Sequence, residues 1–168
     1  MKWTGQLLAV ALAMLFAACE SVNCPLETDV ACVYGFYATG RDADGTFYPG
    51  SAITIGDTLS ITELSQDIVL VNRLIGKSSV SLPVSFYAVA DTLELCLADT
   101  AGNRVYDVIY VEKQSQPHWD DPSCPVKMWH QLTRVTSTHH VIDTVFIANP
   151  TVNYDGLENI KIYFRTGN

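Results

Sequence analysis

The sequence has few basic residues and few of the residues that usually cover helix surfaces. Its 168 residues include 10 Lys and Arg against 18 Asp and Glu, for a formal net charge of −8. Because nucleic-acid binding depends on basic side chains that neutralise phosphates, this composition argues against a nucleic-acid partner. Hydrophobic residues make up 48% of the chain, which is enough for a packed core and excludes a disordered or collagen-like protein.

The chain also lacks an apolar run long enough to cross a membrane as a helix. The unbroken run at residues 7–18 would span about 18 Å as a helix, which is short of the roughly 30 Å hydrocarbon core. It follows closely on Lys2 and ends in small residues, as export signals do. Residues 1–18 are therefore predicted to be a signal peptide that is absent from the mature protein.

The residues after this run indicate the type of signal. Phe16-Ala17-Ala18-Cys19 resembles the lipobox of bacterial lipoproteins, which implies that Cys19 becomes the first mature residue and carries acyl chains such as palmitate. Several acyl chains give lasting membrane anchorage. The alternative is an ordinary secretory signal in which Cys19 is incidental. Residues 19–30 are polar and are predicted to be a tether, and the lack of a dense acidic cluster after Cys19 favours the periplasmic face of the outer membrane.

The mature chain has the composition of an all-β protein. Val, Ile and Thr outnumber Ala and Leu by two to one, and alternating apolar residues predict strands. Residues 64–75 fit both a helix and a strand, and the surrounding strands favour a strand. Residues 99–103 (DTAGN) predict a hairpin turn. We therefore expect a single antiparallel β-sandwich of about eight or nine strands over residues 31–168. The predicted strands are 31–39, 57–63, 84–90, 92–98, 104–112, 127–137, 140–148 and 159–165.

Short segments along the mature chain follow a recurring pattern. Besides the lipobox, they are ACVYGFYAT at 31–39, VSLPV at 80–84, VIY at 108–110, SC at 123–124, THHVID at 138–143 and ENIKIYF at 158–164. Together they resemble a family of uncharacterised lipoproteins of Bacteroidota-type bacteria, which carries a domain of unknown function. The resemblance implies a fold and a lipid-anchored location in the cell envelope, and it implies no chemistry.

The sequence contains none of the common catalytic motifs. Gly-x-Ser-x-Gly, Ser-x-x-Lys, a glycine-rich phosphate loop and His-Glu-x-x-His are all missing. We therefore do not expect an enzyme, and we expect no cofactor.

Metal binding is not expected either. Asp42-Ala43-Asp44-Gly45 has the start of a calcium loop without its later ligands, so it predicts a hairpin turn. His118, Asp120, Asp121 and His130 could converge with His139 and His140, but their spacing fits no standard site. His139 and His140 are expected in one strand, where adjacent side chains point to opposite faces.

Four cysteines remain once Cys19 is acylated. Cys24, Cys32, Cys96 and Cys124 can pair in three ways in an oxidising compartment. Cys24 lies in the tether and Cys124 in a proline-flanked loop, so this pair is favoured. Cys32 and Cys96 lie within predicted strands and form either a second bridge or two buried free thiols.

A candidate binding segment lies in the longest stretch without a strand pattern, residues 114–125. Trp119 follows His118 and precedes Asp120 and Asp121. An exposed indole flanked by hydrogen-bonding side chains suits a sugar or a peptide. The alternative is that Trp119 covers the open end of the sandwich.

These patterns favour a cell-envelope lipoprotein that binds or scaffolds a partner without catalysis. The partner would be an envelope protein or a glycan, and the membrane would be reached through the N-terminal lipid. The alternative is an envelope hydrolase on the same scaffold, since β-sandwiches host both functions. A deep cleft with a histidine and a carboxylate of shifted pKa would favour the hydrolase, and a shallow surface with exposed aromatic residues would favour binding.

Overall fold

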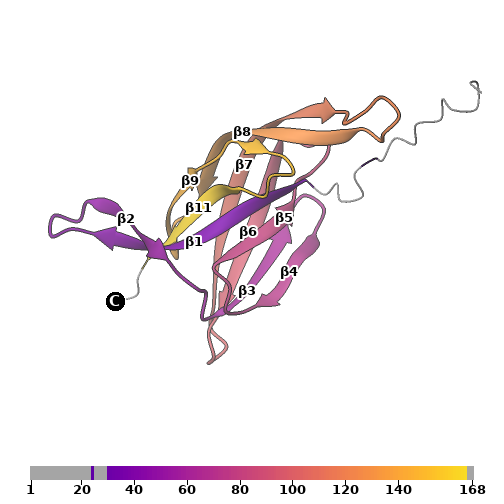
Figure 1. Ribbon diagram of the computed structural model, residues 1–168. Coiled ribbons are helices and arrows are strands. Elements are labelled where there is room, and N and C mark those ends of the chain that lie inside the picture. Colours follow the sequence, from indigo (N-terminus) through magenta and orange to yellow (C-terminus); the bar gives the residue numbers. More distant parts are fainter. Residues whose placement is uncertain (1–23, 25–29, 166–168) are drawn as a thin grey trace, which may run out of the picture. The chain divides into compact units, whose positions relative to one another are not determined.

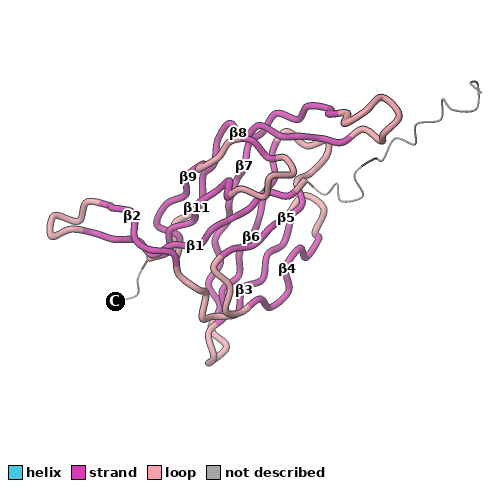
Figure 2. Tube along the Cα trace, in the orientation of Figure 1, coloured by secondary structure: helices cyan, strands magenta, loops and turns pink. Residues whose placement is uncertain are grey.

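The computed structural model describes Cys24 and residues 30–165. The predicted signal peptide, Cys19 and most of the predicted tether lie outside these residues. In the described part every regular element is a strand (Figure 2), and none of it is a helix that could cross a membrane. The strands are β1 (Ala31–Arg41), β2 (Phe47–Ala52), β3 (Thr58–Glu63), β4 (Ile68–Leu74), β5 (Ser79–Pro83), β6 (Ala90–Ala98), β7 (Arg104–His118), β8 (Lys127–Ser137), β9 (Ile142–Ile147), β10 (Thr151–Val152) and β11 (Glu158–Phe164).

The chain divides into two compact units. The described residues of the larger unit are 30–118 and 127–165, and they contain all eleven strands. The described residues of the smaller unit are Cys24 and Trp119–Val126, and the Cys24–Cys124 disulfide lies within it. The sequence predicted one β-sandwich domain over residues 31–168, and all eleven strands fall within this range.

The larger unit is a β-sandwich, as the sequence predicted. The five-stranded sheet, which we call sheet A, has the order β2-β1-β11-β9, and β5 also pairs with β1 (Figure 1). The six-stranded sheet, which we call sheet B, has the order β10-β8-β7-β6-β3-β4. The prediction of eight or nine strands missed β2, β5 and β10, which are short.

One strand pair is parallel. The first strand, β1, pairs with the last strand, β11, so that Phe36 lies beside Ile162 and Ala38 beside Phe164. Parallel neighbours need a long connection, which is usually a helical crossover. Here the connection is the rest of the sandwich, so the chain can make a parallel pair without any helix.

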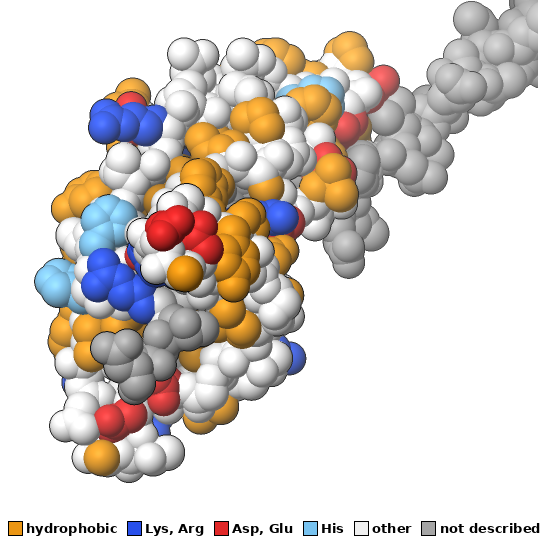
Figure 3. All heavy atoms as spheres, turned by 90° about the vertical axis from the view of Figure 1, so that its left-hand side faces the viewer, with side chains coloured by type: hydrophobic (Ala, Val, Ile, Leu, Met, Phe, Trp, Pro, Cys, Tyr) orange, Lys and Arg blue, Asp and Glu red, His pale blue; other side chains and the backbone are white. Residues whose placement is uncertain are grey.

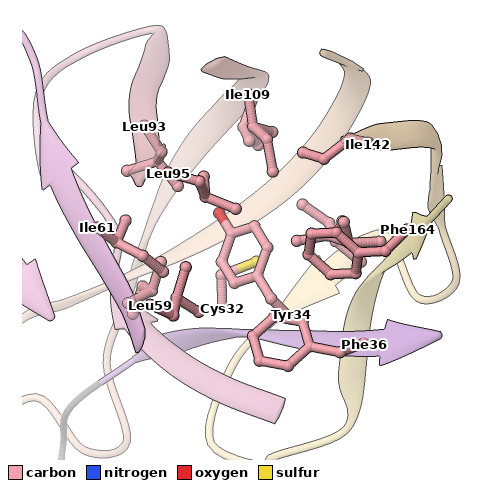
Figure 4. Close-up of a cluster of buried hydrophobic side chains, with 14 of the residues drawn as sticks. Cys32, Tyr34, Phe36, Leu59, Ile61, Leu93, Leu95, Ile109, Ile142 and Phe164 are labelled. Atoms are coloured by element: carbon pink, nitrogen blue, oxygen red, sulfur yellow. The ribbon is translucent and has the colours of Figure 1, made fainter. Parts of the chain in front are cut away.

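The core consists of alternate residues from both sheets. Cys32, Tyr34 and Phe36 project inward from β1, and the hydroxyl of Tyr34 points toward Leu95 of sheet B (Figure 4). On β3 and β6 the same alternation buries every second side chain and leaves the others on the outer face of sheet B. This outer face, and not the core, offers side chains to a ligand.

The structure corrects the strand predicted at residues 84–90 and agrees with the strand favoured within 64–75. Residues 84–90 were predicted as a strand because their apolar residues alternate, but the strand here is β5, which ends at Pro83. The chain then leaves the sheet through a turn in which the Ala88 N–H donates to Ser85 Oγ. Tyr87 lies in this loop and is 90% exposed, so the alternation of apolar residues over 84–90 does not reflect burial. Residues 64–75 contain strand β4, as favoured over a helix.

The predicted loop at residues 114–125 is shorter in the structure. Strand β7 continues to His118 and pairs with β8 up to Lys127. Beyond Lys113 only β8 borders this strand, since β6 begins at Ala90, opposite Glu112. Pro117 is tolerated because a strand with one free edge does not need every N–H.

The adjacent histidines lie in a turn and not in a strand. Strand β9 begins at Ile142, so the predicted strand at 140–148 starts too early and the expected opposite orientation of His139 and His140 does not apply. The buried carboxylate of Asp107 organises this turn by accepting hydrogen bonds from the N–H groups of His140 and Ile142. A charged group therefore fixes the connection between the two sheets.

Candidate functional site

The four residues of the predicted binding segment fall in different units. His118 is the last residue of β7, and its ring stacks on Trp129 with ring centroids 3.7 Å apart. Trp119, Asp120 and Asp121 belong to the smaller unit. The structure therefore gives His118 a packing contact within the larger unit.

Within the smaller unit the loop is built around Asp121 and the disulfide. Asp121 Oδ1 accepts hydrogen bonds from the N–H and the hydroxyl of Ser123, which lower the pKa of the carboxyl. Its carbonyl accepts the N–H of Cys124. The Trp119 side chain is 55% exposed, so it does not have the burial expected of a cap.

The structure contains the disulfide that the sequence favoured and lacks the second bridge that it allowed between Cys32 and Cys96. Cys24 and Cys124 form a disulfide, while Cys32 and Cys96 are free thiols. The second bridge is absent because Cys32 points into the core, whereas Cys96 shares the outer face of β6 with Thr92 and Glu94. Burial raises the pKa of the Cys32 thiol to about 12, so this thiol is unreactive in the folded protein.

A groove lies on the outer face of sheet B in the larger unit. It has a volume of about 570 Å³, which is within the range of ligand-binding sites. Side chains of β3, β4, β6 and β7 and of the β6–β7 turn form it. The lining residues are Thr58, Ser60, Thr62, Val69, Asn72, Arg73, Glu94, Cys96, Ala98, Asp99, Thr100, Gly102, Arg104 and Tyr106.

Hydroxyl groups form the floor of the groove. Thr58, Ser60 and Thr62 alternate with the core residues of β3, so their side chains share the outer face. Across the pair with β6, Ser60 lies beside Cys96 and Thr62 beside Glu94. A row of short polar side chains gives a ligand several hydrogen-bonding partners without filling the groove.

One wall of the groove comes from a β-bulge in β4. The register shifts so that Leu59 pairs with Leu74 and Ile61 with Val71, which leaves Asn72 and Arg73 opposite Ser60 alone. Arg73 has a φ of 58°, which costs an L-residue roughly 1–2 kcal/mol. Its N–H donates to Ser60 Oγ over 3.2 Å. Bulges of this kind redirect side chains, and here both bulge residues line the groove.

The β6–β7 turn forms one end of the groove. Asp99 accepts hydrogen bonds from the N–H groups of Ala101 and Asn103 and from Asn103 Nδ2, and these bonds lower the pKa of its carboxyl. Gly102 adopts a φ of 90°, as the predicted hairpin turn requires. Asp99 thus serves the turn, and its carboxylate has little capacity left for a ligand.

The opposite wall carries an aromatic ring. Tyr106 of β7 lies beside Cys96 in the strand pair and is 43% exposed. An exposed tyrosine offers a flat apolar face and a hydroxyl, which suits the faces and edges of sugar rings. Tyr110 has a similar exposure of 45% and lies on the same face of β7, but it does not line the groove.

A serine and a histidine meet elsewhere in the larger unit. Ser115 Oγ lies 2.9 Å from His130 Nδ1, and burial, followed by the charge of Lys113, lowers the pKa of His130. His130 is only 3% exposed, and the cavity beside it, which Trp129 also lines, measures about 60 Å³. This space is far below the several hundred Å³ of most ligand sites.

Sequence reasoning did not find the groove, although one signal was present. On β3 and β6 polar residues alternate with core residues. This pattern shows which side chains lie on the outer face of sheet B, but it does not show that this face forms a groove. Within residues 30–165 and Cys24, no group of three or more His, Cys, Asp or Glu side chains is arranged to hold a metal ion.

The strands that build this groove lie within a region that matches a known protein family. The family described as "Family of unknown function (DUF6452)" matches residues 58–164, from the start of β3 to the end of β11. The chain belongs to this family. The DUF6452 match includes every residue that lines the groove, whereas β1, β2 and Cys24 precede it. This match confirms the expectation that the chain carries a domain of a family of unknown function. No curated protein and no solved structure matches the chain.

Proposed function

We propose that this protein is a lipid-anchored cell-envelope protein whose β-sandwich binds a glycan in the groove of sheet B without catalysis. The observation that carries the proposal is the combination of a hydroxyl-lined floor with the exposed ring of Tyr106 in a groove of about 570 Å³. Apolar contact with a ring and several hydrogen bonds at its edges are what sugar recognition requires.

The groove has features of a binding site more than of a hydrolytic site. It is lined by no histidine, and Asp99 is engaged by the turn. Most glycosidases need two carboxyl groups with separate roles, and Glu94 alone would have to fill both. These features support binding over hydrolysis.

The proposed location rests on the N-terminal sequence. The lipobox-like residues 16–19 and the polar residues 19–30 support acylation at Cys19, a tether to the outer membrane and an orientation toward the periplasm. The segment pattern shared with Bacteroidota-type lipoproteins supports the same assignment. Nucleic acid is not a proposed partner, because the chain is acidic.

Glycan binding is tested by titrating the purified mature domain with soluble neutral and acidic oligosaccharides. Tyr106→Ala should reduce the affinity on the order of tenfold, which corresponds to about 1.4 kcal/mol. Tyr110→Ala is the matched control, because it removes an equally exposed tyrosine from the same face outside the groove. If no oligosaccharide binds, or if the two variants lose affinity equally, the groove is not a glycan site.

The anchor is tested by expressing the full chain with and without Cys19→Ala. The wild type should fractionate with membranes, and intact mass should give a chain that begins at Cys19 with acyl chains attached. The variant should remain an unprocessed precursor or leave the membrane. A wild-type chain that begins at another residue without added mass would exclude the lipoprotein.

A hydrolase is the second candidate, and the contact between Ser115 and His130 is the observation that favours it. Incubation with oligosaccharide, ester and peptide substrates should give no product if the protein only binds. Product formation that Ser115→Ala abolishes, with the fold retained, would favour the hydrolase.

A further inference from the structure

We infer that the glycan bound in the groove of sheet B is acidic and that Arg73 and Arg104 bind its carboxylate groups. This inference rests on the proposed function and specifies its ligand. The basic side chains in the described part of the chain support it, because two of those that line the groove have no ion pair within the fold.

Most of these basic side chains have a partner. Arg41 and Arg165 both contact the carboxylate of Asp143, and Lys113 contacts Asp91. On the side of the molecule that carries the β1–β2 hairpin, charges of both signs are interspersed with hydrophobic side chains (Figure 3). Six basic side chains pair within the fold: Arg41, Lys113, Arg134, Lys161 and Arg165 with carboxylates, and Lys127 with the ring of Tyr154.

Three described basic side chains have neither an ion pair nor a ring contact within the structure, namely Arg73, Lys77 and Arg104. Two of the three line the groove. Arg73 is directed there by the β4 bulge, in a backbone conformation that an arginine rarely adopts. A strained residue whose charged side chain serves no partner in the fold is the kind of feature that accompanies ligand binding.

The placement of the two arginines indicates an extended ligand. Arg73 lies on β4 and Arg104 on β7, with β3 and β6 between them. Three strand spacings separate the two backbones by about 14 Å. Each guanidinium can bind its own carboxylate through paired hydrogen bonds, so an oligosaccharide with repeated uronic acids fits better than a single small anion.

The acidic residues in the groove are compatible with this ligand. Asp99 is held by the hydrogen bonds of its turn. Glu94 lies beside Thr62, two residue pairs further from the turn than the Ser60–Cys96 pair beside Arg73. It can therefore accept hydrogen bonds from sugar hydroxyls while the carboxylates lie near the arginines. The net charge of the whole protein is −8, and the groove lining holds two arginines and two carboxylates, so binding of an acidic ligand depends on direct contacts with Arg73 and Arg104 and not on net charge.

Cys96 provides a direct readout of occupancy. It is a free thiol that lines the groove, and Cys32, the other free thiol among the described residues, is buried. The rate of alkylation at Cys96 in the folded domain should fall when a ligand covers the groove. This measurement needs no assumption about catalysis.

The test compares matched probes that differ only in charge: oligogalacturonate, oligoguluronate and hyaluronate fragments, and their neutral methyl esters. The acidic forms should protect Cys96 and bind at least about tenfold more tightly than the esters, as expected for charge-assisted hydrogen bonds. Arg73→Gln and Arg104→Gln should each remove most of this preference. Lys77→Gln is the control, because Lys77 is equally unpaired but lies outside the groove.

The outcomes separate the inference from the proposed function. If esters and acids bind equally well, the groove is a glycan site without selection for acidity, and the inference is wrong. If neither form protects Cys96 and none of the variants alters binding, both the glycan site and its acidic ligand are excluded. Binding that depends on charge but is lost equally in Lys77→Gln would contradict the assigned roles of Arg73 and Arg104.

Discussion

The carboxylate of Asp107 accepts a hydrogen bond from the N–H of Ile142, 35 residues further along the chain, with a donor–acceptor distance of 2.8 Å. The same carboxylate accepts bonds from the hydroxyl of Thr138 and the N–H groups of His140 and Val141. Asp107 lies on β7 of sheet B and Ile142 begins β9 of sheet A. One buried charge therefore joins the two sheets of the sandwich.

We expect Asp107→Asn to destabilise the protein by about 3 kcal/mol, because an amide cannot accept all of these bonds and brings its own donor into the site. Denaturant unfolding measures the effect. Asp42→Asn is a control, since the exposed Asp42 also accepts two backbone N–H groups, from Asp44 and Thr46. Its cost should stay below about 1 kcal/mol. Equal costs for the two variants would contradict the role of Asp107.

The Asp107 carboxylate should also make stability depend on pH. Burial raises its pKa, but the hydrogen bonds from His140, Thr138, Ile142 and Val141 outweigh burial and lower it. A carboxyl whose pKa is lower in the folded state contributes stability above its unfolded pKa of about 4, and this contribution disappears as the pH falls through the folded value. The difference in stability between wild type and Asp107→Asn should therefore shrink below about pH 4. A difference that is constant from pH 7 to pH 2 would exclude this linkage.

A buried pair of opposite charges, Lys113 and Asp91, stabilises sheet B. Lys113 Nζ lies 2.9 Å from Asp91 Oδ2, and the Lys113 side chain is fully buried. Lys113→Met should cost about 3–5 kcal/mol, because the Asp91 carboxylate would remain in the core without its partner. The double variant Lys113→Met, Asp91→Leu should recover more than half of this loss in a double-mutant cycle. A double variant as unstable as Lys113→Met alone would show that the charge pair is not what stabilises this region.

The Cys24–Cys124 disulfide closes a loop of 100 residues. In the chain-entropy account, a loop of this length contributes about 4–5 kcal/mol, so replacing both cysteines with serine should lower the free energy of unfolding by an amount approaching this value. Cys96→Ser is the control and should change it by less than about 1 kcal/mol. Peptide mapping without reduction should recover Cys24 joined to Cys124; a peptide joining Cys24 to Cys32 would refute the assignment.

The two free thiols should differ in reactivity. Cys96 lines an open groove, whereas Cys32 is buried and has a pKa of about 12. Brief alkylation of the folded protein should label Cys96, and Cys32 should react only after unfolding. Mass spectrometry of the labelled peptides measures this difference. Equal labelling of both thiols in the folded protein would mean that the core is not closed around Cys32.

Trp119 should contribute little to stability. Because its side chain is 55% exposed, Trp119→Ala should cost less than about 1 kcal/mol. The comparison is Trp129→Ala, whose ring stacks on His118 and whose loss should cost about 3 kcal/mol. A loss of 3 kcal/mol or more in Trp119→Ala would restore the interpretation of Trp119 as a cap of the sandwich.

The fold class and the central strands could be predicted from the amino-acid sequence, which also favoured the disulfide that the structure contains. β3, β6 and β8 could be predicted because each buries one face, and burial imposes an alternation that the amino acids must follow. The Cys24–Cys124 pair could be favoured because both residues lie in proline-flanked, non-strand segments. Residues 84–90 show the limit of this reasoning, since they alternate in an exposed loop.

The position of the groove could not be predicted, because it depends on which strands pair in the folded protein. The groove requires four strands to lie side by side, and the wall that carries Arg73 requires a bulge set by the pairing of β4 with β3. The Asp107 hydrogen bonds join residues more than 30 positions apart. Alternation along a strand shows which side chains leave the core, but it does not show which distant strands become neighbours, and the site consists of those neighbours.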